Sequence, residues 1–155
     1  MPMQMPLRCR SVLVPLLVST GALVAASTPV STPFAATVSR AEVRRGAAEI
    51  AAISGKNYPN GTAYRLMRAC LEKNVQERRA SDAFLVGAHL TIALWVADLP
   101  QDISWREKAF ARHRDLAEWL LPHLGLPPKE VAHLVVHAAG LPAAAERRLI
   151  EAVGR

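Results

Sequence analysis

The densest group of side chains capable of chemistry lies near the C-terminus, where Glu130, His133 and His137 follow one another at intervals of three and four. On a helix these positions fall within about 60° of one another, so they share one face. A carboxylate and two imidazoles can bind Zn²⁺ when a third or fourth ligand completes the set. The sequence therefore offers a candidate zinc or haem site, with His123 or His89 as a further ligand. The alternative interpretation is a set of ordinary polar residues beside an apolar stripe.

Two other histidines, His89 and His113, lie on mostly apolar stretches and are predicted to be buried. A buried neutral imidazole needs hydrogen-bond partners, and Asn74, Thr91 and Asp115 are the candidates. Two interpretations stay open: histidines that are satisfied within the core, or a pair that responds to pH.

Nothing in the sequence favours nucleophilic catalysis, since Gly-x-Ser-x-Gly and phosphate-binding loops are absent and no His adjoins Cys70. We therefore expect no enzymatic activity. Cys70 shares a helix face with Leu66 and Met67, which predicts burial as a small hydrophobic residue. The alternative is an intermolecular disulfide, which would give a homodimer.

All these side chains depend on helices for their position, and one helix organises the others. Residues 83–97, AFLVGAHLTIALWVA, present apolar side chains in every direction, which is typical of a helix buried on all sides. At about 1.5 Å per residue the segment is roughly 22 Å long, shorter than the ~30 Å hydrocarbon core of a bilayer. We predict the central helix of a compact bundle. Gly87 is expected to let a neighbouring helix approach closely.

Five further helices are predicted around this one, and no stretch alternates as a strand does. Capping signals mark four of the six starts, namely Ser39 with Glu42, Thr62, Ser81 for the central helix, and Ser104 with Glu107. The last two helices follow the Gly-Leu-Pro segments at 125–127 and 140–142. The expected bounds are 40–53, 63–78, 105–121, 128–139 and 142–153. Trp105 and Trp119 fall in the core-facing sector of the helix at 105–121. The predicted class is all-α, with about six helices.

Residues 1–26 have the features of a secretory signal peptide, with Arg8 and Arg10 before an apolar run. We expect cleavage after Ala26, and a cut after Ala36 is the alternative. The mature chain would then be periplasmic or secreted, and it would meet a membrane only transiently, through the signal peptide.

Cleavage would leave two segments of different composition. Residues 27–38 are rich in Pro, Ser and Thr, which predicts a flexible linker. Residues 39–155 form a single predicted helical domain. Because Cys9 is lost with the leader, Cys70 would be the only cysteine, and no intramolecular disulfide is expected.

The composition, 51% hydrophobic and 21% charged, is that of a globular chain. The formal net charge is +6, and two of these charges belong to the leader, which leaves a mild +4. The arginine pairs at 44–45, 78–79 and 147–148 are scattered, so nucleic acid is not an expected partner. A helix-turn-helix interpretation of 126–153 conflicts with export.

Two motifs resemble those of a known family. Residues 62–70, TAYRLMRAC, followed after a polar gap by residues 84–88, FLVGA, are similar to the helical immunity proteins of the Rap/Tai group. The resemblance implies a small periplasmic protein that neutralises a cell-wall-hydrolysing effector delivered by type VI secretion. The family's further cysteines are missing, since Ala83 and Ala143 stand near where they would be, so its disulfides cannot form.

These features together predict a small exported helical protein that binds another protein. An immunity or inhibitor role is the specific form of this hypothesis. Tyr58, Trp105 and Trp119 are candidate anchors because aromatic side chains dominate interface energetics. The alternative is a periplasmic protein that binds a metal or haem through Glu130 and the two histidines that follow it.

Overall fold

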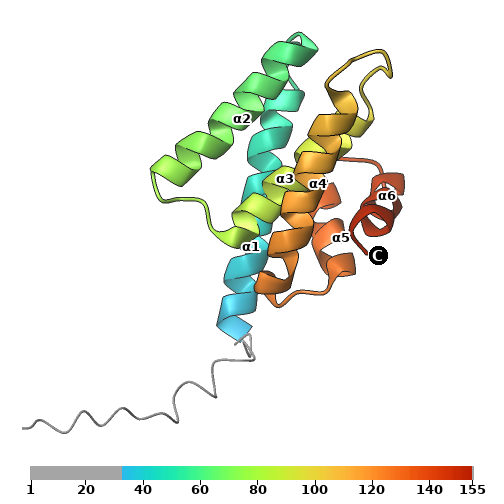
Figure 1. Cartoon of the computed structure of the whole chain (residues 1–155). Helices are drawn as coiled ribbons and strands as arrows, with labels where there is room; N and C mark the ends of the chain where they lie inside the picture. The colour runs from blue at the N-terminus through green and yellow to red at the C-terminus, as the bar shows by residue number, and fades with distance from the viewer. Residues whose placement is uncertain (1–32, 155) are drawn as a thin grey trace, which may run out of the picture.

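A computed structural model describes residues 33–154, and these residues form six α-helices and one short 3-10 helix, without strands (Figure 1). The elements in chain order are α1 (Pro33–Ser54), α2 (Asn60–Gln76), α3 (Asp82–Ala97), α4 (Arg106–Leu120), η3 (Leu121–Leu124), α5 (Pro128–Ala138) and α6 (Ala144–Val153). The all-α prediction is confirmed. The predicted signal peptide lies outside the described residues.

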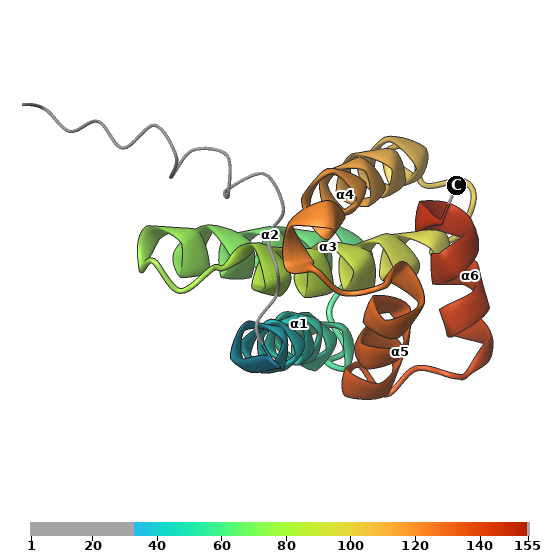
Figure 2. The same ribbon diagram turned by 90° about the horizontal axis from the view of Figure 1, so that it is seen from below.

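Helix α3 occupies the centre of the bundle. It lies between α1 and α4, and α5 and α6 pack against one end of it (Figures 1 and 2). Helix α2 projects beyond the rest of the bundle. Twelve of its sixteen residues are buried, which confirms the predicted central helix. Among the helices that the structure describes, none is both long and apolar enough to span a membrane.

Two glycines allow the backbones of α1 and α3 to touch. A Cβ added to Gly87 would lie 2.1 Å from the carbonyl oxygen of Val43, and one added to Gly46 would lie 2.1 Å from that of Phe84. Real Cβ atoms essentially never approach other heavy atoms more closely than 3.0 Å. The predicted close approach at Gly87 is therefore confirmed, and Gly46 is its counterpart on α1.

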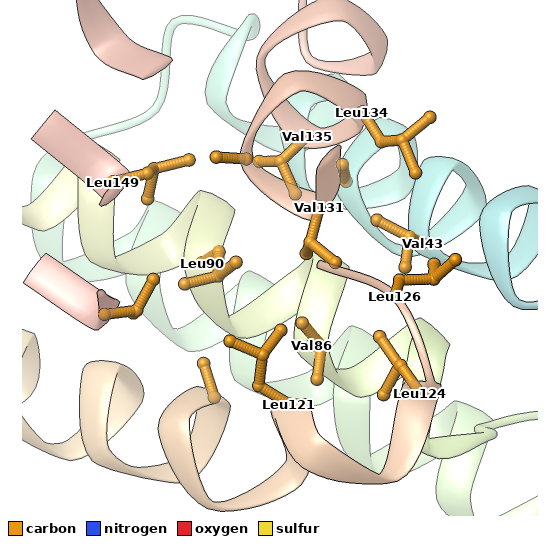
Figure 3. Packing of buried hydrophobic residues seen from close by; sticks show 14 of the residues in the cluster. Val43, Val86, Leu90, Leu121, Leu124, Leu126, Val131, Leu134, Val135 and Leu149 are labelled. Atoms are coloured by element: carbon orange, nitrogen blue, oxygen red, sulfur yellow. The ribbon is translucent and has the colours of Figure 1, made fainter. Parts of the chain in front are cut away.

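The apolar core divides into two clusters on either side of this helix contact. The larger one fills the space between α1, α3, α4, η3, α5 and α6, and Figure 3 shows its packing. The smaller one lies where α1, α2, α3 and α4 meet, and Phe84, Ile50 and Met67 are its largest fully buried members. Leu, Val, Ala and Ile dominate both clusters, as the scarcity of aromatic residues requires.

Helix α1 begins at Pro33 instead of near residue 40, so the prediction of a flexible linker is wrong for residues 33–38. Proline is well tolerated in the first turn of a helix. Ala36 packs against the larger core cluster, which gives this first part of α1 a buried contact. Ser39 consequently lies inside the helix and does not cap it.

The other capping predictions had different outcomes. Ser81 caps α3 as expected, because its Oγ accepts a hydrogen bond from the Phe84 backbone N–H at 3.2 Å. Thr62 and Ser104 do not act as N-caps. Helix α2 starts earlier, behind Pro59, and α4 starts later, behind Trp105, and neither start has a side-chain cap.

A polar network around Arg45 joins α1 to the end of α2. The guanidinium donates to Glu42 at 2.9 and 3.1 Å, to Glu49 at 3.2 Å and to the Asn74 Oδ1 at 3.1 Å. It also lies over the Phe84 ring, 4.1 Å from the centroid. The hydrogen bonds that Glu42 accepts from Arg45 hold the pKa of its carboxyl below the usual value.

We expect Arg45→Met to lower the free energy of unfolding by about 2 kcal/mol, because two carboxylates and the buried Asn74 amide would each lose one of their hydrogen-bond partners. Urea denaturation checks this value. The matched control is Arg44→Met on the exposed side of α1, which should change stability by less than about 0.5 kcal/mol. Equal effects of the two substitutions would contradict a stabilising role for the network.

Helix α2 ends on a residue in a conformation that favours glycine. Arg78 has a φ of 55°, and the N–H groups of Arg78 and Arg79 bond to the carbonyls of Val75 and Asn74. A side chain in this left-handed region costs about 1 kcal/mol. Glycine removes this cost but also makes the unfolded chain more flexible, which offsets part of the gain. We therefore expect Arg78→Gly to stabilise the protein by about 0.5 kcal/mol.

Thermal unfolding of Arg78→Gly beside Arg78→Ala separates backbone strain from side-chain loss. The alanine variant keeps the Cβ and should gain nothing. A melting temperature raised equally in both variants would show that the charge of Arg78, and not its backbone conformation, limits stability.

Candidate functional site: a groove between α2 and α4

A groove of about 360 Å³ opens between α2 and α4, with α3 forming its floor. Its apolar lining comes from Leu71 and Val75 of α2, Leu85 of α3 and Leu116 of α4. Val75 is 55% exposed, although its neighbours on the same lining are largely covered. Concave, mostly apolar sites with a few polar groups are the usual binding sites of proteins.

Two of the four polar side chains at the edges of the groove are arginines. Arg68 of α2 and Arg112 of α4 are exposed and line it from opposite helices, together with Glu72 and Gln76. The guanidinium of Arg68 also lies 5.9 Å from the ring centroid of Tyr64. The groove thus combines apolar walls with two cations.

The floor of the groove holds a pair of buried histidines, and both line it. The Nδ1 atoms of His89 and His113 are 2.8 Å apart, and their rings stack with centroids 5.1 Å apart. His89 is 8% exposed and His113 is 2% exposed, which confirms the predicted burial. The two rings therefore share one hydrogen bond inside the protein.

Tyr64 of α2 extends this pair into a chain of three groups. Its hydroxyl lies 2.8 Å from the Nε2 of His113, and its ring stacks on Trp105 with centroids 5.0 Å apart. Trp105 is half-buried in this contact, so it supports Tyr64 and the histidine pair. Hydrogen bonds thus run from α2 through α4 to α3.

Burial keeps both imidazoles neutral at physiological pH. Loss of contact with water is the main cause that lowers the pKa of His89 to about 4, and the Arg112 charge adds to it. Burial likewise lowers the pKa of His113 to about 3, with further contributions from His89, Arg112 and Arg68. Apart from the neighbouring histidine, the charged side chains that shift these two pKa values are arginines.

The expected partners of the two histidines were wrong. Thr91 donates to the Gly87 carbonyl, Asn74 bonds within the Arg45 network, and Asp115 pairs with Arg114. The sequence did not predict the contact of Tyr64 with His113, because the two residues are 49 positions apart and lie on different helices. Only the packing of α2 against α4 brings these two side chains together.

The structure does not assemble Glu130, His133 and His137 into one ligand set. Glu130 forms an ion pair with Arg40 of α1. The Nδ1 of His133 lies 3.2 Å from the Glu146 carboxylate of α6, and the rings of His133 and His137 are 6.2 Å apart. Within residues 33–154, no three His, Cys, Asp or Glu side chains are grouped to hold a metal ion.

The two further candidate ligands are also engaged elsewhere. His123 pairs with Asp82 at 3.0 Å, and His89 belongs to the groove. The zinc and haem hypotheses therefore have no preassembled site in the described part of the chain, and they stay predictions.

The three aromatic anchors do not form one surface. Tyr58 is 40% exposed in the turn between α1 and α2, whereas Trp119 is 70% exposed at the C-terminal end of α4. The prediction that Trp119 faces the core is wrong, because Ala117 and Leu120 turn the buried stripe of α4 away from it. Trp119 instead meets the edge of the His123 ring.

Cys70 is half-buried, and its Sγ lies 3.6 Å from a Glu49 carboxylate oxygen. Burial raises the pKa of the Cys70 thiol, and the Glu49 charge raises it further. Because the thiolate is the reactive form, this environment disfavours disulfide exchange.

No protein-family model, curated protein or solved structure matches the chain. The groove and its histidine pair are therefore the features of the described structure that bear on function.

Proposed function

We propose that this chain is an exported binding protein without enzymatic activity, whose α2–α4 groove receives an apolar segment of a partner protein. The observation that carries the proposal is the groove itself, with apolar side chains from three helices and Val75 more than half exposed at its edge. Grooves between helices commonly take the apolar face of a partner segment. An immunity or inhibitor role is the specific form of this proposal.

Export follows from the features of residues 1–26 and sets the compartment of the proposed partner. N-terminal sequencing of the protein recovered from a periplasmic fraction or from culture medium tests this step. A chain that starts at Ser27 would support it. Intact Met1 in a cytoplasmic fraction would contradict it.

The groove is tested by site-specific photo-cross-linking in the native host. A photoreactive benzophenone amino acid at Val75 should give one discrete adduct with another protein. The matched control places the same amino acid at Lys129, an exposed position in the first turn of α5. An adduct at both positions or at neither would contradict docking in the groove.

Leu116→Glu provides the complementary variant. Leu116 is half-buried on the α4 wall, so a carboxylate there should abolish the Val75 adduct while the helical circular dichroism spectrum stays unchanged. Trp119→Ala, on the same helix but outside the groove lining, should leave the adduct intact. An unchanged adduct in Leu116→Glu would place the partner elsewhere.

A further inference from the structure

One ring nitrogen of the histidine pair faces the groove without a partner. His89 uses its Nδ1 for the bond to His113, and among residues 33–154 no hydrogen-bonding group contacts its Nε2. His89 lines the groove, although the residue as a whole is only 8% exposed. Among the described residues, the Arg106 Nε is the one enclosed side-chain polar atom without a partner. The His89 Nε2 is therefore not enclosed, and a group that enters the groove can reach it.

The chain of hydrogen bonds sets the role of this nitrogen. A neutral imidazole has one N–H donor and one acceptor nitrogen. When the Tyr64 hydroxyl donates to the His113 Nε2, the His113 Nδ1–H must donate to the His89 Nδ1, which puts the His89 proton on Nε2. The reverse direction would make Tyr64 an acceptor and leave its hydroxyl proton without a partner in the described structure. The first direction keeps every donor of this chain paired inside the protein, and in it the groove-facing nitrogen is a donor.

The charges around the floor favour an anion as the acceptor. Arg112 acts on both rings and Arg68 on one, and no carboxylate among the described residues contributes to either effect. Glu72 is the one acidic residue of the groove lining, against these two arginines. A net positive charge beside an N–H donor suits a carboxylate, since charge-assisted hydrogen bonds are the stronger ones.

We propose that the floor of the groove recognises a carboxylate side chain carried on the apolar segment of the partner protein, with His89 Nε2–H as its donor and Arg112 as the neighbouring cation. This inference rests on the proposed function, because it names the chemistry of the segment that occupies the same groove. The apolar walls then hold the segment, and the carboxylate sets its position along the groove.

The test uses two small probes that share an apolar chain and differ in whether the head group is a carboxylate or a neutral amide. Octanoate and octanamide are titrated at pH 7 into the purified protein carrying ¹⁵N-labelled histidine. Octanoate is expected to bind about ten-fold more tightly than octanamide and to shift the His89 Nε2 resonance. Equal affinities, or tighter binding of octanamide, would overturn the carboxylate assignment.

Variants separate the donor from the cation. His89→Leu should bring the affinities of the two probes close together, and His137→Leu on the exposed face of α5 should keep the difference. Arg112→Gln should weaken octanoate binding more than octanamide binding, and its exposed position leaves the fold intact. An undiminished preference for octanoate in both groove variants would overturn the proposal.

The two proposals fail in distinguishable ways. A Val75 adduct without any preference for octanoate leaves the docking groove standing and overturns the carboxylate site. A clear preference for octanoate without a protein adduct identifies the occupant as a free apolar acid and overturns the commitment to a partner protein.

Discussion

Replacing Gly87 by alanine is expected to lower the free energy of unfolding by about 3 kcal/mol or more, and Gly46→Ala should have a similar effect. The added Cβ would lie 2.1 Å from a backbone carbonyl oxygen of the facing helix in each case. A side chain could rotate away from such a clash, but a helix backbone has to move as a whole. Separating α1 from α3 would loosen both core clusters at once. Urea denaturation measures the loss.

Gly61→Ala is the matched control, because a Cβ at that position in α2 meets nothing within 4 Å. Alanine also has the higher helix propensity, so this variant should be neutral or slightly stabilised. The double variant Gly46→Ala/Gly87→Ala should lose less than the sum of the single losses, since either Cβ alone forces the same two helices apart. An unchanged melting temperature in Gly87→Ala would show that α3 is not the buried centre.

The central helix could be predicted because its signal is local. Residues 83–97 are apolar in every direction, so burial follows without knowledge of any neighbour. Gly87 stood out for the same reason, as the residue without a side chain on that helix. Gly46 did not, because a glycine on an amphipathic helix acquires meaning only when the facing backbone is known.

Helix starts were predicted less well because capping competes with packing. Ser81 caps α3 where the preceding chain turns. Ser39 and Ser104 have the same local signal, but burial of Ala36 extends α1 past the first of them. At the second, Trp105 stacks on Tyr64 just before α4 begins. A cap contributes about 1 kcal/mol, which one buried apolar contact can match.

The candidate site depended almost wholly on tertiary structure. Burial of His89 and His113 was predicted from their apolar surroundings, but the direct bond between them was not. The spacing of Glu130, His133 and His137 suggested a shared face, which they do have on α5. Arg40 and Glu146 on neighbouring helices nevertheless provide the partners of Glu130 and His133, which helical periodicity alone cannot reveal.

Lowering the pH from 7 to 5 is expected to reduce the free energy of unfolding by about 3 kcal/mol through the histidine pair. In the folded protein the pKa of His89 is about 4 and that of His113 is about 3. Unfolded histidines titrate near 6.5, so below that pH the unfolded chain binds more protons than the folded one. The stability due to neutral burial is complete above pH 6.5 and declines as the pH falls toward 4.

The double variant His89→Leu/His113→Leu should largely abolish this dependence, because apolar replacement of both partners leaves no buried imidazole to protonate. His133→Leu/His137→Leu removes two exposed histidines from α5 and should keep it. The pKa of the Glu42 carboxyl is lowered by Arg45, so this group stays ionised between pH 7 and 5. The expected change in stability over this range therefore comes from the histidines. A wild-type stability that is flat between pH 7 and 5 would mean that the pair accepts a proton without unfolding. The His89–His113 contact would then be open to water, and the donor assigned to the groove floor would lose its basis.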